Sequence, residues 1–170
     1  MATTKFGNKP FWLNTLTGAK AEVIPKNSSH DLWEYWDSEL EWRVHQELLK
    51  KYPSQFIERQ STQLLLPSSR HFPVLTWRCD FKLSLPILPA NSADILIEAK
   101  GRWVLSKGEF KHSFRRLLQT LAFTNPLQYE RTIVVDNSPW KLCREIKVIG
   151  IKDLHSEILK LLPIEYKPRS

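Results

Sequence analysis

Residues 76–84 read TWRCDFKLS and form the clearest strand pattern in this 170-residue chain. Apolar and polar side chains alternate along the whole stretch, which is typical of a β-strand with one buried face. The alternation places Trp77, Cys79, Phe81 and Leu83 on one face, and Arg78, Asp80 and Lys82 on the other. The next strand is expected at residues 93–99, ADILIEA, whose short length and isoleucine content favour a buried strand over a helix. Asp80 and Glu98 are therefore expected on consecutive strands.

The rest of the chain shows helical and strand patterns around these two strands. Apolar residues recur every three or four positions in segments that predict amphipathic helices: residues 31–51, residues 110–121 with an end near Asn125-Pro126, and residues 154–162 with Asp153 as a candidate N-cap. Further strands are expected at residues 56–66, 131–136 and 145–151, and a basic, aromatic loop at residues 101–103. This order of elements indicates a three-layer α/β core in which helices flank a central mixed sheet.

The domain organisation follows from the same pattern. Residues 1–30 contain turn and loop signals and are expected to form an accessory N-terminal segment. Residues 31–170 are expected to form the core domain, because a chain of this length typically holds one hydrophobic core.

The chain is basic, with 25 Lys and Arg against 18 Asp and Glu and a formal net charge of +7. Its apolar content of 42% excludes an intrinsically disordered protein. A polyanion such as DNA or RNA suits this charge better than an acidic small molecule.

The expected location follows from the absence of targeting signals. The sequence has no apolar run near the ~18–20 residues of a membrane span and no secretion signal at its N-terminus. We therefore expect a soluble, cytoplasmic protein with no membrane partner. Cys79 and Cys143 lack the spacing of a metal site, so reduced thiols are expected and zinc is not.

Three ionisable side chains form a candidate chemical site. Glu98 and Lys100 project from the same face of their strand because side chains alternate, and they meet Asp80 if the two strands pair. Two carboxylates on adjacent strands supply oxygen ligands suited to Mg²⁺, which activates water for hydrolysis of a phosphodiester. Glu41, in the first expected helix, is the best candidate for a further acidic ligand. The alternative is a solvated sheet face whose ion pairs are each worth less than ~1 kcal/mol.

The order of these residues resembles the PD-(D/E)xK nuclease superfamily. The resemblance covers about residues 41–136 and includes SELE at residues 38–41, RCDF at residues 78–81, EAKGRW at residues 98–103, and RTIVV at residues 131–135. Within the superfamily, this order resembles the small homing endonucleases of cyanobacterial group I introns and phage junction-resolving endonucleases. Cys79 stands where many members have Pro before the Asp.

The resemblance implies a restriction-endonuclease-like core and an activity. Asp80, Glu98 and Glu41 would be metal ligands for Mg²⁺ or Mn²⁺, and Lys100 would assist the nucleophile. The implied function is a Mg²⁺-dependent endonuclease acting on double-stranded DNA, first of all a sequence-specific homing endonuclease. The alternatives are a Holliday-junction-resolving enzyme, a transposon-end-cleaving subunit, or a DNA-binding module without catalysis. Cutting both strands with one site per chain implies a homodimer or homotetramer.

Polar residues outside the acids are candidates for contacts with DNA. Candidates for the phosphate backbone or the grooves are Arg70, His71, Arg102, Trp103, Lys107, Lys111, Arg115 and Arg116. Gln60, Thr62 and Gln63 are candidates for reading base edges, because Gln pairs with adenine through two hydrogen bonds. Gln119, in the helix after Lys100, is a secondary candidate for the active site.

Overall fold

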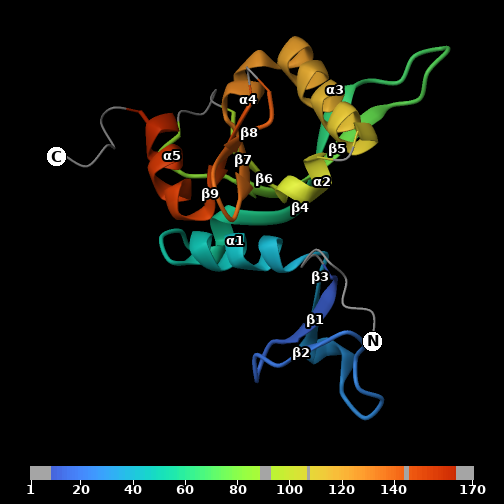
Figure 1. Ribbon diagram of the computed structural model, residues 1–170, viewed down its shortest axis with the longest axis vertical. Helices are drawn as coiled ribbons and strands as arrows, with labels where there is room; N and C mark the ends of the chain where they lie inside the picture. The colour runs from blue at the N-terminus through green and yellow to red at the C-terminus, as the bar shows by residue number, and fades with distance from the viewer. Residues whose placement is uncertain (1–8, 89–92, 107, 144–145, 164–170) are drawn as a thin grey trace.

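A computed structural model describes residues 9–88, 93–106, 108–143 and 146–163 (Figure 1). Its main feature is a six-stranded mixed sheet in the order β4-β5-β6-β7-β9-β8. The strands are β4 (Ile57–Leu66), β5 (Leu75–Leu83), β6 (Ile95–Ala99), β7 (Thr132–Asp136), β8 (Trp140–Lys141) and β9 (Lys147–Gly150). All but the short β8 confirm strands expected from the sequence, although the expected start of the last one, at residue 145, lies outside the described residues.

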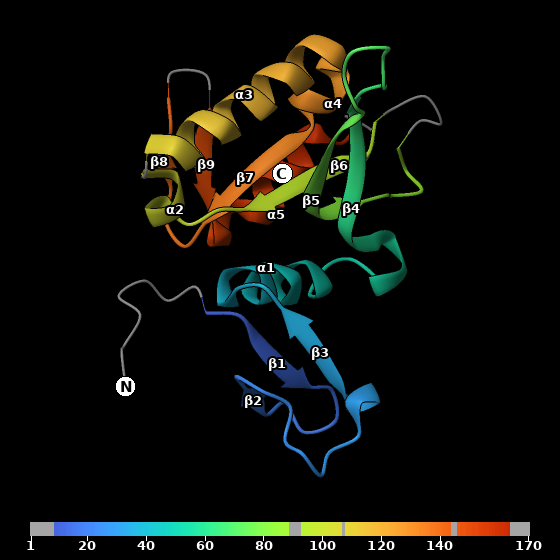
Figure 2. The same ribbon diagram turned by 90° about the vertical axis from the view of Figure 1, so that its right-hand side faces the viewer.

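Helices cover both faces of this sheet and complete a three-layer α/β fold (Figure 1, Figure 2). Helices α1 (Glu39–Leu49) and α5 (Leu154–Leu161) pack on one face, and α2 (Arg102–Ser106) and α3 (Gly108–Thr124) pack on the other. In the central strands, alternate residues enter the two cores: Ile97, Val135 and Ile149 face α1 and α5, and Leu96, Val134 and Val148 face α3. The expected fold class is confirmed.

The strand directions bring the carboxyl ends of two neighbouring strands to the same edge of the sheet. β6 runs antiparallel to β5 and parallel to β7, and the crossover between β6 and β7 consists of α2, α3 and α4 (Pro126–Glu130). All five residues of β6 are buried, as expected for a central strand covered on both faces. The carboxyl ends of β6 and β7 therefore lie side by side, with Ala99 paired to Val135.

A small antiparallel sheet at the N-terminal side lies next to α1 (Figure 2). Its order is β2-β1-β3, from β1 (Phe11–Asn14), β2 (Lys20–Ala21) and β3 (Trp33–Trp36). Phe11 and Trp36 are buried in the same core cluster as α1 and α5. The small sheet is thus packed onto the main domain and extends beyond residue 30.

The first helix begins later than the sequence pattern predicted. Residues 31–38 were expected to be helical, but Trp33 and Trp36 lie in β3, which pairs with β1 over its whole length. The helix starts at Glu39, because Ser38 is extended (φ −155°) and its Oγ accepts a hydrogen bond from the Glu41 backbone N–H at 3.1 Å. The three- and four-residue spacing of the tryptophans was therefore misleading: pairing with a distant strand outweighs a local helical pattern.

The Ser38 cap allows a test of this start. We expect Ser38→Ala to lower the free energy of unfolding by about 1 kcal/mol, because the first turn of α1 loses a capping acceptor. Chemical denaturation measures the change, and Ser156→Ala serves as control, because the Ser156 hydroxyl is exposed and donates to the backbone carbonyl of Asp153, just before α5. Equal stability of the two variants would contradict the cap.

The pleat of β5 is interrupted at Asp80, contrary to the unbroken alternation that was expected. The apolar residues before it, Trp77 and Cys79, pack in the α3 core, and those after it, Phe81 and Leu83, pack in the α1 core. Gln60, opposite Asp80 on β4, has a φ of 54°, in the left-handed region that few non-glycine residues adopt. The two strands therefore change faces together, and Asp80 lies at the point of change.

The structure also differs from the sequence expectations in smaller ways. Residues 102 and 103 belong to α2 and not to a loop, because Asp136 Oδ2 accepts from the Arg102 N–H at 2.8 Å at the start of this helix. α4 and β8 were not expected, since both are very short. Asp153 lies at the N-cap position of α5, as expected, but its side chain makes no cap hydrogen bond.

Candidate active site

Strands β5 and β6 separate at the point where Asp80 and Glu98 lie. Their pairing runs from Leu83–Ile95 to Phe81–Ile97 and ends there. In place of the next backbone bonds, Glu98 Oε2 accepts from the Asp80 N–H at 3.2 Å, and Asp80 Oδ2 accepts from the Ala99 N–H at 2.8 Å. The two carboxylates thus replace the backbone hydrogen bonds of the ladder with reciprocal bonds and fill the opening between the strands. We call this opening, with the side chains of Asp80 and Glu98 in it, the fork.

Lys100 completes the fork from the end of β6. Its backbone N–H donates to the Val135 carbonyl at 2.9 Å, which fixes the residue beside β7. Its Nζ lies 2.7 Å from Glu98 Oε1 and 3.6 Å from Asp80 Oδ2. Both carboxylates are nearly fully buried, whereas the Lys100 side chain keeps 28% of its surface exposed. The ammonium group therefore lies between the buried acids and solvent.

Glu41 approaches the fork from α1. It lies in the first turn of the helix, is buried, and accepts a hydrogen bond from Gln60 Nε2 at 3.3 Å through its Oε2. Its carboxylate is close enough to Asp80 and Lys100 to interact with both electrostatically. The structure therefore brings together all four residues selected from the sequence for this site.

The pKa values reflect three acids buried near one ammonium group. Burial raises the pKa of Glu98 to about 7, and repulsion from Asp80 adds to the rise. Burial raises the pKa of Glu41 to about 8, with further contributions from Asp80 and Asp37. Burial also raises the pKa of Asp80, against the opposing effect of Lys100. For Lys100, burial lowers the pKa, but Glu98 and Asp80 outweigh it and the net shift is upward.

These shifts predict that stability falls with rising pH in the absence of divalent cations. Glu98 and Glu41 hold their protons more tightly folded than unfolded, where the Glu pKa is near 4.5, so the stabilisation is complete below that value and is lost through pH 7 and 8. In EDTA, the free energy of unfolding should fall by on the order of 1–2 kcal/mol from pH 6.5 to 8.5. Urea denaturation at a series of pH values measures it.

A series that starts at pH 6.5 avoids the titration of two histidines, whose effect on the free energy of unfolding has the opposite sign. Burial lowers the pKa of His45 and His155, so these two residues change the free energy of unfolding mainly at pH values under 6.5. Glu41→Gln is the matched variant, since it removes one of the two titrating acids and should flatten the curve. A free energy of unfolding that does not change between pH 6.5 and 8.5 would contradict the crowding of acids in the fork.

The donor set fits a hard divalent cation. Mg²⁺ binds to proteins through one or two carboxylates and completes its octahedron with waters and substrate phosphate oxygens. Asp80 and Glu98 provide two such carboxylates at one point, and burial raises the pKa of both. Within the described ranges, no three His, Cys, Asp or Glu side chains are arranged as a ready-made metal site. Glu41 therefore lies near the pair without completing a three-ligand set.

The candidate DNA contacts are spread over three parts of the surface. Arg70 and His71 are exposed at the tip of the β4–β5 hairpin, which projects away from the core in Figure 1. Arg102 and Trp103 lie in α2, directly after the fork. Lys111, Arg115 and Arg116 lie along α3, and Lys107 lies outside the described residues.

Gln119 does not reach the fork. It is exposed on the flank of α3 that lines a separate pocket with Arg115, Tyr129 and Cys143. Gln60, by contrast, was considered only for reading bases, yet it donates to Glu41 inside the site. Its left-handed backbone points it there, and this conformation has no sequence signal such as Gly or Asn.

Two acidic residues near the site were not selected from the sequence. Asp37 precedes the cap of α1 and raises the pKa of Glu41. Asp136, at the end of β7, accepts from the Arg102 N–H at 2.8 Å and from the Trp140 indole at 3.0 Å, so it fixes the start of α2 beside the fork. Spacing along the chain gave no reason to place either residue near Asp80.

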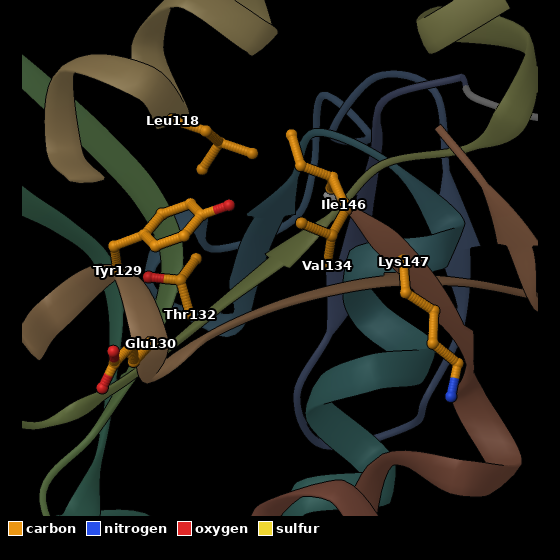
Figure 3. A pocket seen from close by; sticks show the side chains of 7 residues that line it. All are labelled: Leu118, Tyr129, Glu130, Thr132, Val134, Ile146 and Lys147. Atoms are coloured by element: carbon orange, nitrogen blue, oxygen red, sulfur yellow. The ribbon is translucent and has the colours of Figure 1, made fainter. Parts of the chain in front are cut away.

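The thiol of Cys79 and a separate cavity do not take part in the site. Burial raises the pKa of the Cys79 thiol to about 12, so it is not a nucleophile at neutral pH. A cavity of about 200 Å³ lies between α3, α4 and strands β7 and β9, with the Tyr129 ring across from Leu118 and Ile146 (Figure 3). This cavity contains none of the site residues and is separate from the fork.

Comparisons with known proteins give no match: no family model, no curated protein and no solved structure is similar to this chain. Among the helices of the described residues, none combines the length and apolar character needed to cross a bilayer.

Proposed function

We propose that this protein is a Mg²⁺-dependent endonuclease that hydrolyses phosphodiester bonds in DNA. The observation that carries the proposal is the fork, where Asp80, Glu98 and Lys100 meet within 3.6 Å at the open end of two central strands. A solvated sheet face does not account for it, because both carboxylates are at least 94% buried and the strands separate around them.

Each group of the fork has a distinct role in this proposal. Asp80 and Glu98 would hold the cation, and Glu41, buried beside them, would add a third acidic group to its surroundings. When bound, Mg²⁺ acts as a Lewis acid and lowers the pKa of a coordinated water. Lys100 orients the attacking water and stabilises negative charge that develops on the phosphate oxygens, as a preorganised cation in a partly dry site. Gln60 positions Glu41 through its hydrogen bond.

The choice of DNA as substrate rests on charge and shape. The formal net charge of +7 favours a polyanion over a small anion. The β4–β5 hairpin carries Arg70 and His71 away from the core, and a two-stranded ribbon is an element that the major groove of DNA accommodates. These features favour a sequence-reading enzyme of the homing type. Cutting both strands from one site per chain then needs a homodimer or homotetramer.

Cleavage assays test the proposal. Supercoiled plasmid, a synthetic four-way junction and a pool of random duplexes are each incubated with Mg²⁺ or with EDTA. Cleavage confined to rare duplex sequences supports the homing type, and selective cutting of the junction supports a junction-resolving enzyme instead. If no substrate is cut in Mg²⁺ or Mn²⁺, the nuclease proposal fails and the protein is a DNA-binding module at most.

A further inference from the structure

A shallow apolar groove of about 250 Å³ opens directly beside the fork. Glu98 and Lys100 form one of its walls. Its floor consists of three buried side chains: Trp77 from β5, Leu105 from α2 and Phe114 from α3. The site residues are therefore continuous with a surface that their own chemistry does not require.

The rim of this groove consists of an exposed aromatic ring and a cation. Phe110, in the first turns of α3, leaves 60% of its surface exposed although it lines the groove. Arg78, on β5 next to Trp77, is also exposed and lines the groove.

The apolar floor and the cations at the edges together indicate which kind of ligand the groove would bind. A phosphate group alone does not explain an apolar floor of Trp77, Leu105 and Phe114, and an apolar ligand alone does not explain Lys100 and Arg78 at the edges. A nucleotide satisfies both, because its base is a flat ring that stacks on aromatic side chains while its phosphate seeks cations.

We propose that this groove holds a single unstacked base of the substrate strand, next to the phosphate bound at the fork. The inference rests on the proposed nuclease function and specifies its substrate: DNA in which one nucleotide beside the cut is unpaired, or is extruded from the duplex. Phe110 stacks on the base, and Arg78 binds the flanking phosphate. Extrusion costs least at a mismatched or unpaired position, so such sites are preferred over perfect duplex.

The test measures binding in EDTA, so it does not depend on cleavage. Two duplexes are compared, which differ only in whether a single 2-aminopurine is unpaired or paired. Each is titrated with the full chain, and the fluorescence of the 2-aminopurine reports its stacking. The unaltered protein should prefer the duplex with the unpaired base and quench its fluorescence. Phe110→Ala should reduce this preference about tenfold, because base–aromatic stacking is lost.

Two variants make the result specific. Phe123→Ala is the matched control, since Phe123 lies on the same helix, is 90% exposed and does not line the groove. Phe110→Trp keeps an aromatic ring and should retain the preference. Equal binding of paired and unpaired DNA, or an equal loss in the Phe110→Ala and Phe123→Ala proteins, would overturn the inference. Metal-dependent cleavage of perfect duplex would still support the nuclease proposal, so the two failures are distinguishable.

Discussion

DNA cleavage by the Lys100→Ala protein is expected to fall by about 10²–10³-fold. Lys100 Nζ lies 2.7 Å from Glu98 and 3.6 Å from Asp80, at the opening of the fork where the phosphate would bind. In the proposed mechanism, removal of this ammonium group takes away the positive charge that stabilises the negative charge developing on the phosphate. The initial rate of plasmid nicking at saturating Mg²⁺ measures the effect.

The control for this experiment is a lysine on a neighbouring strand. Lys82, on β5, forms its ion pair with Glu58 on β4, away from the fork. Lys82→Ala should cleave at nearly the rate of the unaltered protein. If Lys100→Ala also cleaves at that rate, while both proteins remain folded by circular dichroism, Lys100 has no role in the reaction.

Asp80→Asn is expected to remove both the Mg²⁺ affinity and the cleavage activity. The substitution keeps the shape of the side chain, and its amide oxygen can still accept the hydrogen bond from the Ala99 N–H. It removes one of the two carboxylates that form the fork, and loss of a Lewis acid that contributes several kcal/mol predicts a rate decrease of at least about 10³-fold. Calorimetric titration with Mg²⁺ measures the affinity.

Stability separates this effect from misfolding. Because the pKa of Asp80 is raised by burial, a neutral Asn should not destabilise the EDTA-treated protein. Asp94→Asn is the control, since Asp94 precedes the opposite end of β6. Unchanged Mg²⁺ affinity in Asp80→Asn would show that the cation binds elsewhere.

Local periodicity was sufficient to predict most of the fold and the core of the site. The alternation around Asp80 and the short apolar run before Glu98 identified two consecutive strands, and these are β5 and β6. The two-residue spacing of Glu98 and Lys100 placed both on one face, as the ion pair between them confirms. Such features can be predicted from the sequence because strand geometry fixes the direction of side chains over short distances.

Features that depend on distant contacts were not readable. Trp33 and Trp36 fitted a helical spacing, but pairing with β1 makes them part of a strand. The change of face at Asp80 depends on the left-handed conformation of Gln60, which is in a different strand. The contact between Gln60 and Glu41 joins residues from two elements whose packing the sequence does not specify. In each case tertiary structure outweighs a local preference.

The most direct test of the fork as a metal site is diffraction from crystals grown with Mn²⁺, recorded at a wavelength where manganese scatters anomalously. The account predicts an anomalous peak in the opening between β5 and β6, in contact with the carboxylates of Asp80 and Glu98, that disappears in Asp80→Asn. Strong peaks elsewhere, with none between these two carboxylates, would contradict it.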